Sequence, residues 1–154
     1  MRHNNRQFDK SSYDSNDQRA KDAIVGYLNK NGYKDIVPRE DYFFDVAAKK
    51  DKNYFFEVEI KNQWGDSWPP FWKEVRIPDR KKRLIKKWKE EYKDHDLIFV
   101  VFNTDCSQAW FIDGDTVSSS PIGTIQNSSR IGSPHLKEPF FHVPKEKANL
   151  IQIN

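Results

Sequence analysis

Residues 42–61 read YFFDVAAKKDKNYFFEVEIK, and they carry the clearest information about the fold. Two largely apolar segments, 42–48 and 54–61, flank the polar turn KKDKN. This pattern predicts two strands paired as a β-hairpin. In the second strand the side chains alternate, so that Tyr54 begins an apolar face and Phe55 begins a face that also carries two acids and a lysine. The apolar face is expected to lie against the core.

The pairing of the two strands decides where Asp45 points. In one register Asp45 faces Glu59, and in a register shifted by two residues it faces Glu57 and lies diagonal to Glu59. Both registers put the three acids and Lys61 on one face of the hairpin. A shift by one residue would instead send Asp45 into the core beside Val58. We therefore expect one of the two registers that keep the charges together.

Two ionised carboxylates on neighbouring strands repel each other, so a fold keeps them only where something offsets the repulsion. A divalent cation does this, and carboxylate oxygens are hard ligands that suit Mg²⁺ or Mn²⁺. Lys61 lies two residues after Glu59 and projects to the same face, where it could orient an attacking water or neutralise charge on a phosphate. The charged face is therefore a candidate catalytic site.

The length and composition of the chain limit its domain organisation and its cellular location. A chain of 154 residues is expected to form one domain, here residues 15–154 after a polar, flexible leader at 1–14. Cys106 is the only cysteine, so no intrachain disulfide can form. Neither a membrane-spanning run nor a signal peptide is present, so we expect a soluble protein of the cytoplasm, or of the host cytoplasm if a virus encodes it.

Positive charge is concentrated in one segment. Residues 73–93 hold ten Lys or Arg against four acids, and such a segment favours binding to a polyanion such as nucleic acid. A solvated, lysine-rich helix face gives the same pattern and stays an alternative. The phosphate contacts predicted from this segment are Arg76, Arg80, Lys81, Arg83, Lys86 and Lys87.

The remaining segments complete a mixed α/β pattern. Helices are predicted from Ser15 to a C-terminal cap at Gly32 and over residues 79–93, because apolar residues recur there at helical spacing. The run LIFVVFN at 97–103 predicts a strand buried on both faces. The order predicts a central mixed β-sheet flanked by helices. Shorter predicted elements are an extended piece at 35–37, a loop at 62–78, strands at 109–112 and 140–143, an irregular stretch at 118–134, and a C-terminal helix from Pro144 to Leu150.

Together these features resemble the PD-(D/E)XK nuclease superfamily. Its signature is an acid on one strand followed by Asp/Glu-X-Lys on the next, and this chain has Asp45 and then Glu59-Ile60-Lys61. The family core is one helix, a three-stranded hairpin sheet, a second helix and a further strand, and the predicted order over 15–103 is similar. The resemblance implies a restriction-endonuclease-like αβββαβ core with a C-terminal extension. It also implies metal-dependent hydrolysis of phosphodiester bonds, with DNA favoured over RNA.

The resemblance assigns roles to single residues as well. Asp45, Glu59 and the carbonyl of Ile60 would hold Mg²⁺ or Mn²⁺. Lys61 would act beside them, and Gln63 would lie close to the substrate, as a polar residue does at that position in many members. These residues form the site that the resemblance implies.

Other acids near the motif leave alternatives open. Glu57 would be a ligand of a second metal or lie in the second shell, or it would form a cross-strand salt bridge with Lys49 or a neighbour. Phe44 precedes Asp45, so the proline of the motif name is missing. Asp41 is the rival for the first acid. Weaker candidates for an acid from the first helix are Asp17 and Asp22.

The loop after Lys61 is unusually aromatic. Its aromatic side chains could stack on unpaired bases, or they could cover the end of the sheet as core. They are Trp64, Trp68, Phe71 and Trp72.

A function of another class also fits the sequence, namely a non-catalytic nucleic-acid-binding module on a degenerate nuclease fold. The histidines have no zinc-binding spacing, and the chain has no P-loop. The sequence leaves open whether the protein forms a homodimer.

Overall fold

The computed structural model describes residues 2–38, 44–124 and 139–153, and for residues 2–14 it describes the backbone only. None of the described helices combines the length and the hydropathy that crossing a bilayer requires. The helices are α1 (Arg2–Lys30), α2 (Lys82–Glu91) and α3 (Gly114–Ser119), with short 3-10 helices η1 (Asp79–Lys81) and η4 (Lys145–Lys147). The strands are β1 (Lys34–Pro38), β2 (Val46–Lys49), β3 (Asn53–Ile60), β4 (Glu74–Pro78), β5 (His95–Phe102), β6 (Gln108–Asp113), β7 (Ile122–Thr124), β8 (Pro139–Pro144) and β9 (Asn149–Gln152).

The described strands form two sheets. The larger sheet has the strand order β1-β2-β3-β5-β6-β9, and the smaller one has the order β4-β8-β7. In the larger sheet β3 and β5 run parallel, whereas the other neighbouring pairs are antiparallel. The connection from β3 to β5 passes through β4, η1 and α2. The prediction of a mixed α/β fold with a mixed sheet is therefore confirmed.

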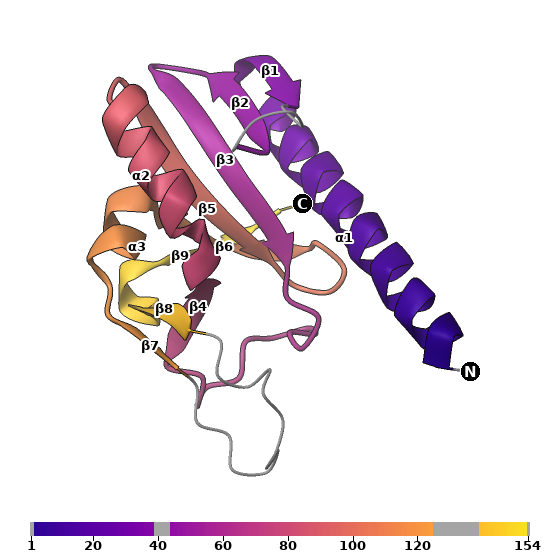
Figure 1. Cartoon of the computed structure of the whole chain (residues 1–154). Coiled ribbons are helices and arrows are strands. Elements are labelled where there is room, and N and C mark those ends of the chain that lie inside the picture. The colour runs from indigo at the N-terminus through magenta and orange to yellow at the C-terminus, as the bar shows by residue number, and fades with distance from the viewer. Residues whose placement is uncertain (1, 39–43, 125–138, 154) are drawn as a thin grey trace.

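Helices cover both faces of the larger sheet (Figure 1). On one face, Ala20, Ile24 and Leu28 of α1 belong to the same core as Phe56 and Val58 of β3. The other face is covered by α2, α3 and the smaller sheet. Because β3 lies between these two layers, the side chains on its charged face point toward α2. Buried members of this second core include Phe55, Leu84, Ile85, Trp88 and Phe99.

The hairpin formed by β2 and β3 is confirmed, and the structure fixes its register. Val46 lies opposite Phe56, and the pairing is antiparallel. Asp45 immediately precedes β2, so it lies level with Glu57 and diagonal to Glu59. This register is the second of the two that keep the acids on one face.

Several elements differ from their predictions. The first helix begins at Arg2 and not at Ser15, the 62–78 loop contains the strand β4, and α3 was not predicted. The predicted C-terminal helix is the single turn η4, which is followed by the strand β9. The predicted irregular stretch 118–134 contains the strand β7. All three unpredicted strands pair with distant segments, β4 and β7 with β8 and β9 with β6, and a short strand is stabilised mainly by such partners. Asp41 lies outside the described residues.

Candidate functional site

The carboxylates of Asp45 and Glu57 each accept a backbone hydrogen bond across the end of the hairpin. The Val58 N–H donates to Asp45 Oδ2 at 2.9 Å, and the Asp45 N–H donates to Glu57 Oε2 at 3.1 Å. Lys81 Nζ donates to Glu57 Oε1 at 2.6 Å. These contacts fix both carboxylates, because each one accepts a hydrogen bond from a main-chain amide. Two strands and η1 thus meet at this point.

Glu57 and Lys81 form a buried ion pair. Their side chains are 6% and 19% exposed. Burial, with the nearby charge of Asp45, raises the pKa of Glu57 to about 8, although Lys81 opposes the rise. Burial alone would lower the pKa of Lys81, but the charges of Glu57, Asp45 and Glu59 together raise it. Lys81 therefore remains positively charged in the midst of three carboxyl groups.

Glu59 lies at the edge of a cleft. Burial raises the pKa of Glu59, while Lys81, Arg80 and Lys61 oppose the rise. Glu59 lines a cleft of about 830 Å³. Within the described part of the chain, its carboxylate has no hydrogen-bonding or ion-pairing partner, in contrast to that of Glu57. Its oxygens are thus available to a ligand in the cleft.

Lys61 stands beside Glu59 at the same cleft. Its backbone N–H donates to the Phe102 carbonyl at 2.8 Å, which extends the pairing of β3 with β5 past the end of the strand. Its ammonium lies 5.2 Å from the centroid of the Trp72 ring. Burial, together with the charge of Arg76, lowers the pKa of Lys61, whereas Glu59 opposes the effect. Glu59 and Lys61 are therefore an acid and a base side by side in one cleft.

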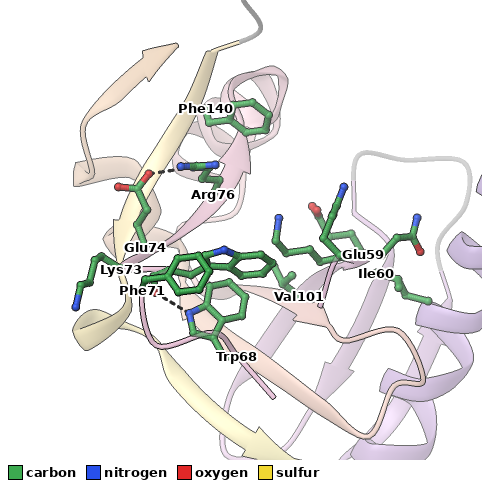
Figure 2. Close-up of a pocket in the computed structure, with 13 residues that line it drawn as sticks. Glu59, Ile60, Trp68, Phe71, Lys73, Glu74, Arg76, Val101 and Phe140 are labelled. Atoms are coloured by element: carbon green, nitrogen blue, oxygen red, sulfur yellow. Dashed lines mark hydrogen bonds and ion pairs between the residues drawn. The ribbon is translucent and has the colours of Figure 1, made fainter. Parts of the chain in front are cut away.

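The cleft separates the acids from an aromatic wall. Figure 2 shows Glu59 and Ile60 at one end, with Trp68 and Phe71 opposite and Arg76 paired to Glu74 on β4. Gln63 also lines this cleft and is exposed. The complete lining is Glu59, Ile60, Lys61, Asn62, Gln63, Trp68, Phe71, Trp72, Lys73, Glu74, Arg76, Val101 and Phe140.

The predicted phosphate contacts differ in their surroundings. Arg83 and Lys86 are exposed on α2, and Lys87 pairs with Glu91 at 3.1 Å. Arg76 Nε pairs with Glu74 at 3.1 Å at the edge of the cleft. Arg80 is exposed on η1 and acts electrostatically on Glu59. Lys81 does not lie on the outer surface with the others, because its ammonium is buried against Glu57.

Glu57 has a different partner from the one predicted. Lys49 is exposed and lies opposite Asn53, so it does not reach Glu57. The ion pair is made instead by Lys81, a residue that sequence spacing alone could not connect to the hairpin. Glu57 also uses both oxygens within the protein, which leaves it no free oxygen for a second metal in this arrangement.

The candidate acids of the first helix have partners of their own. Asp17 pairs with Lys21 at 3.1 Å, and Asp22 accepts a hydrogen bond from Gln18 at 2.9 Å. Burial raises the pKa of Asp45, and the charge of Asp17 adds to this rise. Asp17 is therefore close enough to influence the site electrostatically, whereas Asp22 is an exposed helix residue.

The donor set is compatible with a hard divalent cation. Among the described residues, no three His, Cys, Asp or Glu side chains are arranged to hold a metal. Mg²⁺, however, typically takes one or two carboxylates and completes its shell with water and phosphate oxygens. Asp45 keeps Oδ1 free of the hydrogen bond that Oδ2 accepts, and Glu59 keeps its carboxylate free. Free carboxylate oxygens of this kind are ligands that Mg²⁺ and Mn²⁺ prefer.

No protein-family model and no curated protein matches this sequence. The geometry of the cleft and of its acids is therefore the basis for a functional conclusion.

We expect Glu57→Gln to make stability less dependent on pH. A carboxyl whose pKa is raised keeps its proton in the folded state where the unfolded chain has lost it, so stability falls as pH rises from about 4.5 to about 8. Glutamine resembles the protonated acid and cannot titrate. Thermal unfolding followed by circular dichroism across this pH range measures the slope. Glu146→Gln, at an exposed position, should keep the slope of the unmodified protein, and an equally steep slope in Glu57→Gln would contradict the assignment.

Proposed function

We propose that the protein is a metal-dependent nuclease of the PD-(D/E)XK type that hydrolyses phosphodiester bonds of nucleic acid, with DNA favoured. The observation that carries this proposal is the register of the hairpin. It puts Asp45 on the same face as Glu59, and Lys61 follows Glu59 into the cleft. An acid, a second acid and a lysine in this relation are what such chemistry requires.

The order of the elements supports the proposal as well. The helix α1, the strands β1 to β3, the helix α2 and the strand β5 follow one another in the order of a restriction-endonuclease-like core, and β5 runs parallel to β3. The strand β4 is an addition between β3 and α2. The strands and short helices after β5 then form the C-terminal extension.

Each residue of the site has a physical task. Asp45, Glu59 and the carbonyl of Ile60 would hold Mg²⁺ or Mn²⁺ through hard oxygen atoms. When bound, the ion lowers the pKa of water and offsets the charge that develops on the phosphate. Lys61 presents a positive charge to the phosphate or to the attacking water from the same side of the cleft. Lys81 limits the repulsion among the acids.

The cations around the site suit a polyanionic substrate. Arg76 lines the cleft, and Arg80 acts on Glu59 from η1. Arg83 and Lys87 lie four residues apart on α2, so they share one side of that helix, and Arg80 precedes them on η1. Contacts of this kind hold a phosphate backbone in position without reading its sequence. They would hold a nucleic-acid strand close to Asp45 and Glu59.

Cleavage of plasmid and single-stranded DNA in the presence of Mg²⁺, Mn²⁺ or EDTA tests the proposal. We expect cleavage with either metal and none with EDTA. Lys61→Met should lower the rate by about 10²–10³-fold, because a charge aimed at the transition state is lost. Lys30→Met, an exposed lysine at the end of α1, should cut like the unmodified protein. Cleavage that persists in EDTA, or that is insensitive to Lys61→Met, would rule the mechanism out.

One observation favours a second function, a nucleic-acid-binding module that does not cut. Lys81 already provides a positive charge among Asp45, Glu57 and Glu59. A degenerate site could rely on this lysine in place of a metal. Salt-sensitive binding of nucleic acid by the unmodified protein, with no cleavage in any divalent metal, would support this function over the nuclease.

A further inference from the structure

The loop between β3 and β4 carries aromatic side chains that hydrolysis of a phosphodiester does not require. Trp68, Phe71 and Trp72 line the cleft, and Figure 2 shows Trp68 and Phe71 across it from Glu59. Trp64, by contrast, is completely buried, so it belongs to the core. Three of the four aromatic residues of this loop thus reach the cleft.

This aromatic wall is held rigidly. The Trp68 Nε1–H donates to the Trp72 carbonyl at 2.8 Å, and the two rings meet edge to face at 5.0 Å. Trp68 also packs edge to face on the buried Trp64 at 5.1 Å. The Trp72 N–H donates to the carbonyl of Pro69 at 3.0 Å, in a loop stiffened by two consecutive prolines. A ligand would therefore meet a preformed surface.

Phe71 is the exposed member of the wall. Its side chain is 74% exposed, whereas the next most exposed large apolar residue in the described part of the chain, Val37, is 50% exposed. Its ring lies 6.5 Å from that of Trp72, at a steep angle. Aromatic groups that a fold leaves in water on an ordered wall are typical of binding surfaces. Phe71 thus extends the wall into solvent.

Cations accompany the aromatic rings. Lys61 Nζ lies 5.2 Å from the centroid of Trp72, and Arg76 lines the same cleft. A purely apolar ligand would gain nothing from these charges, whereas a strand of nucleic acid offers phosphates to the cations and flat bases to the rings. In a duplex the faces of the bases are hidden in the stack, so only unpaired bases can lie against such a wall.

We propose that the cleft binds unpaired nucleotides and that the substrate of the site is single-stranded nucleic acid or a single-stranded segment of it. That the bound strand is a substrate rests on the proposed nuclease function, whereas the binding of unpaired nucleotides does not. A base stacked on Phe71 or Trp68 keeps its phosphate on the side of Lys61. Glu59 lies next to Lys61, so the phosphate of a wall-bound nucleotide reaches the acids.

Binding in EDTA, where no metal-dependent cleavage occurs, tests the inference. Fluorescence anisotropy of labelled oligo-dT, oligo-U and a blunt DNA duplex of equal length gives three affinities. We expect both single strands to bind more tightly than the duplex, and the intrinsic tryptophan fluorescence to be quenched on binding. Phe71→Leu should weaken single-strand binding by about tenfold, because one stacked base loses its aromatic partner.

Two further variants separate the effect of base stacking from that of side-chain size. Phe71→Trp keeps an aromatic face and should bind like the unmodified protein, although it changes the size of the side chain. Leu150→Ala, an exposed apolar position on β9 that does not line this cleft, should leave every affinity unchanged. Since Phe71 is exposed, its replacement is not expected to disturb folding, which the thermal midpoint checks.

The outcomes distinguish this inference from the nuclease proposal. Tight binding of single strands that depends on Phe71 supports the inference even if no metal induces cleavage. Preference for the duplex, equal binding by Phe71→Leu, or no binding of any oligonucleotide overturns it, even if the protein cuts duplex DNA in Mn²⁺.

Discussion

Replacing Glu59 by Gln is expected to abolish metal-dependent cleavage while leaving the fold intact. Glu59 is the acid whose carboxylate is open to the cleft, and the amide that replaces it is a much weaker ligand for a hard cation. We expect the initial rate on plasmid and single-stranded DNA to fall by about 10²–10³-fold or more, as when other groups that stabilise the transition state are removed. Initial rates at saturating Mg²⁺ or Mn²⁺ measure this loss.

Although the cleavage rate of Glu59→Gln should fall, its thermal stability should stay equal or rise. Burial raises the pKa of Glu59, so the folded state disfavours its charged form at neutral pH, and removing that charge should leave the thermal midpoint equal or higher. Functional sites often carry such a cost in stability. Glu146→Gln is the matched control for cleavage. A Glu59→Gln protein that cuts at the normal rate would exclude Glu59 from the reaction.

Replacing Lys81 by Met is expected to have the largest effect on stability. Its ammonium is 2.6 Å from Glu57 Oε1, and both side chains are largely buried. Removal of one partner of a buried pair leaves the other charge uncompensated and typically costs about 3–5 kcal/mol. The loss should approach this value near pH 9, where the acids are ionised, and should be smaller near pH 6, where Glu57 takes up a proton.

Denaturant unfolding of Lys81→Met at the two pH values measures the effect. Lys86→Met, on the exposed side of the neighbouring helix, should unfold like the unmodified protein at both. The double variant Lys81→Met with Glu57→Gln should regain much of the lost stability, since the unpaired acid is gone. A loss that does not depend on pH, or that the second substitution does not relieve, would show that Lys81 acts through packing and not through charge.

The local parts of the fold could be predicted from the amino-acid pattern alone. Alternation of side chains specified the hairpin and its two faces, and helical spacing specified α2 with Leu84, Ile85 and Trp88 inward. The continuous apolar run at 97–103 specified β5, which lies between β3 and β6. Each signal repeats within a few residues, so each could be recognised without knowledge of the neighbours.

The aromatic loop was only half determined by its sequence. Its composition predicted aromatic anchors but could not separate core from surface. Trp64 is buried, whereas Phe71, seven residues later, is exposed. What distinguishes them is their position relative to Trp110 and the smaller sheet, which belong to distant parts of the chain.

The register of the hairpin and the partners of the acids depend on long-range packing. Alternation of side chains allowed two registers. The observed register, in which Asp45 lies opposite Glu57, depends on the turn and on the layers packed against β3. Lys81 comes from η1, and its approach to Glu57 follows from the return of the chain over the sheet toward β5. Contacts between residues so far apart in sequence leave no periodic trace, because they arise only when separate elements pack.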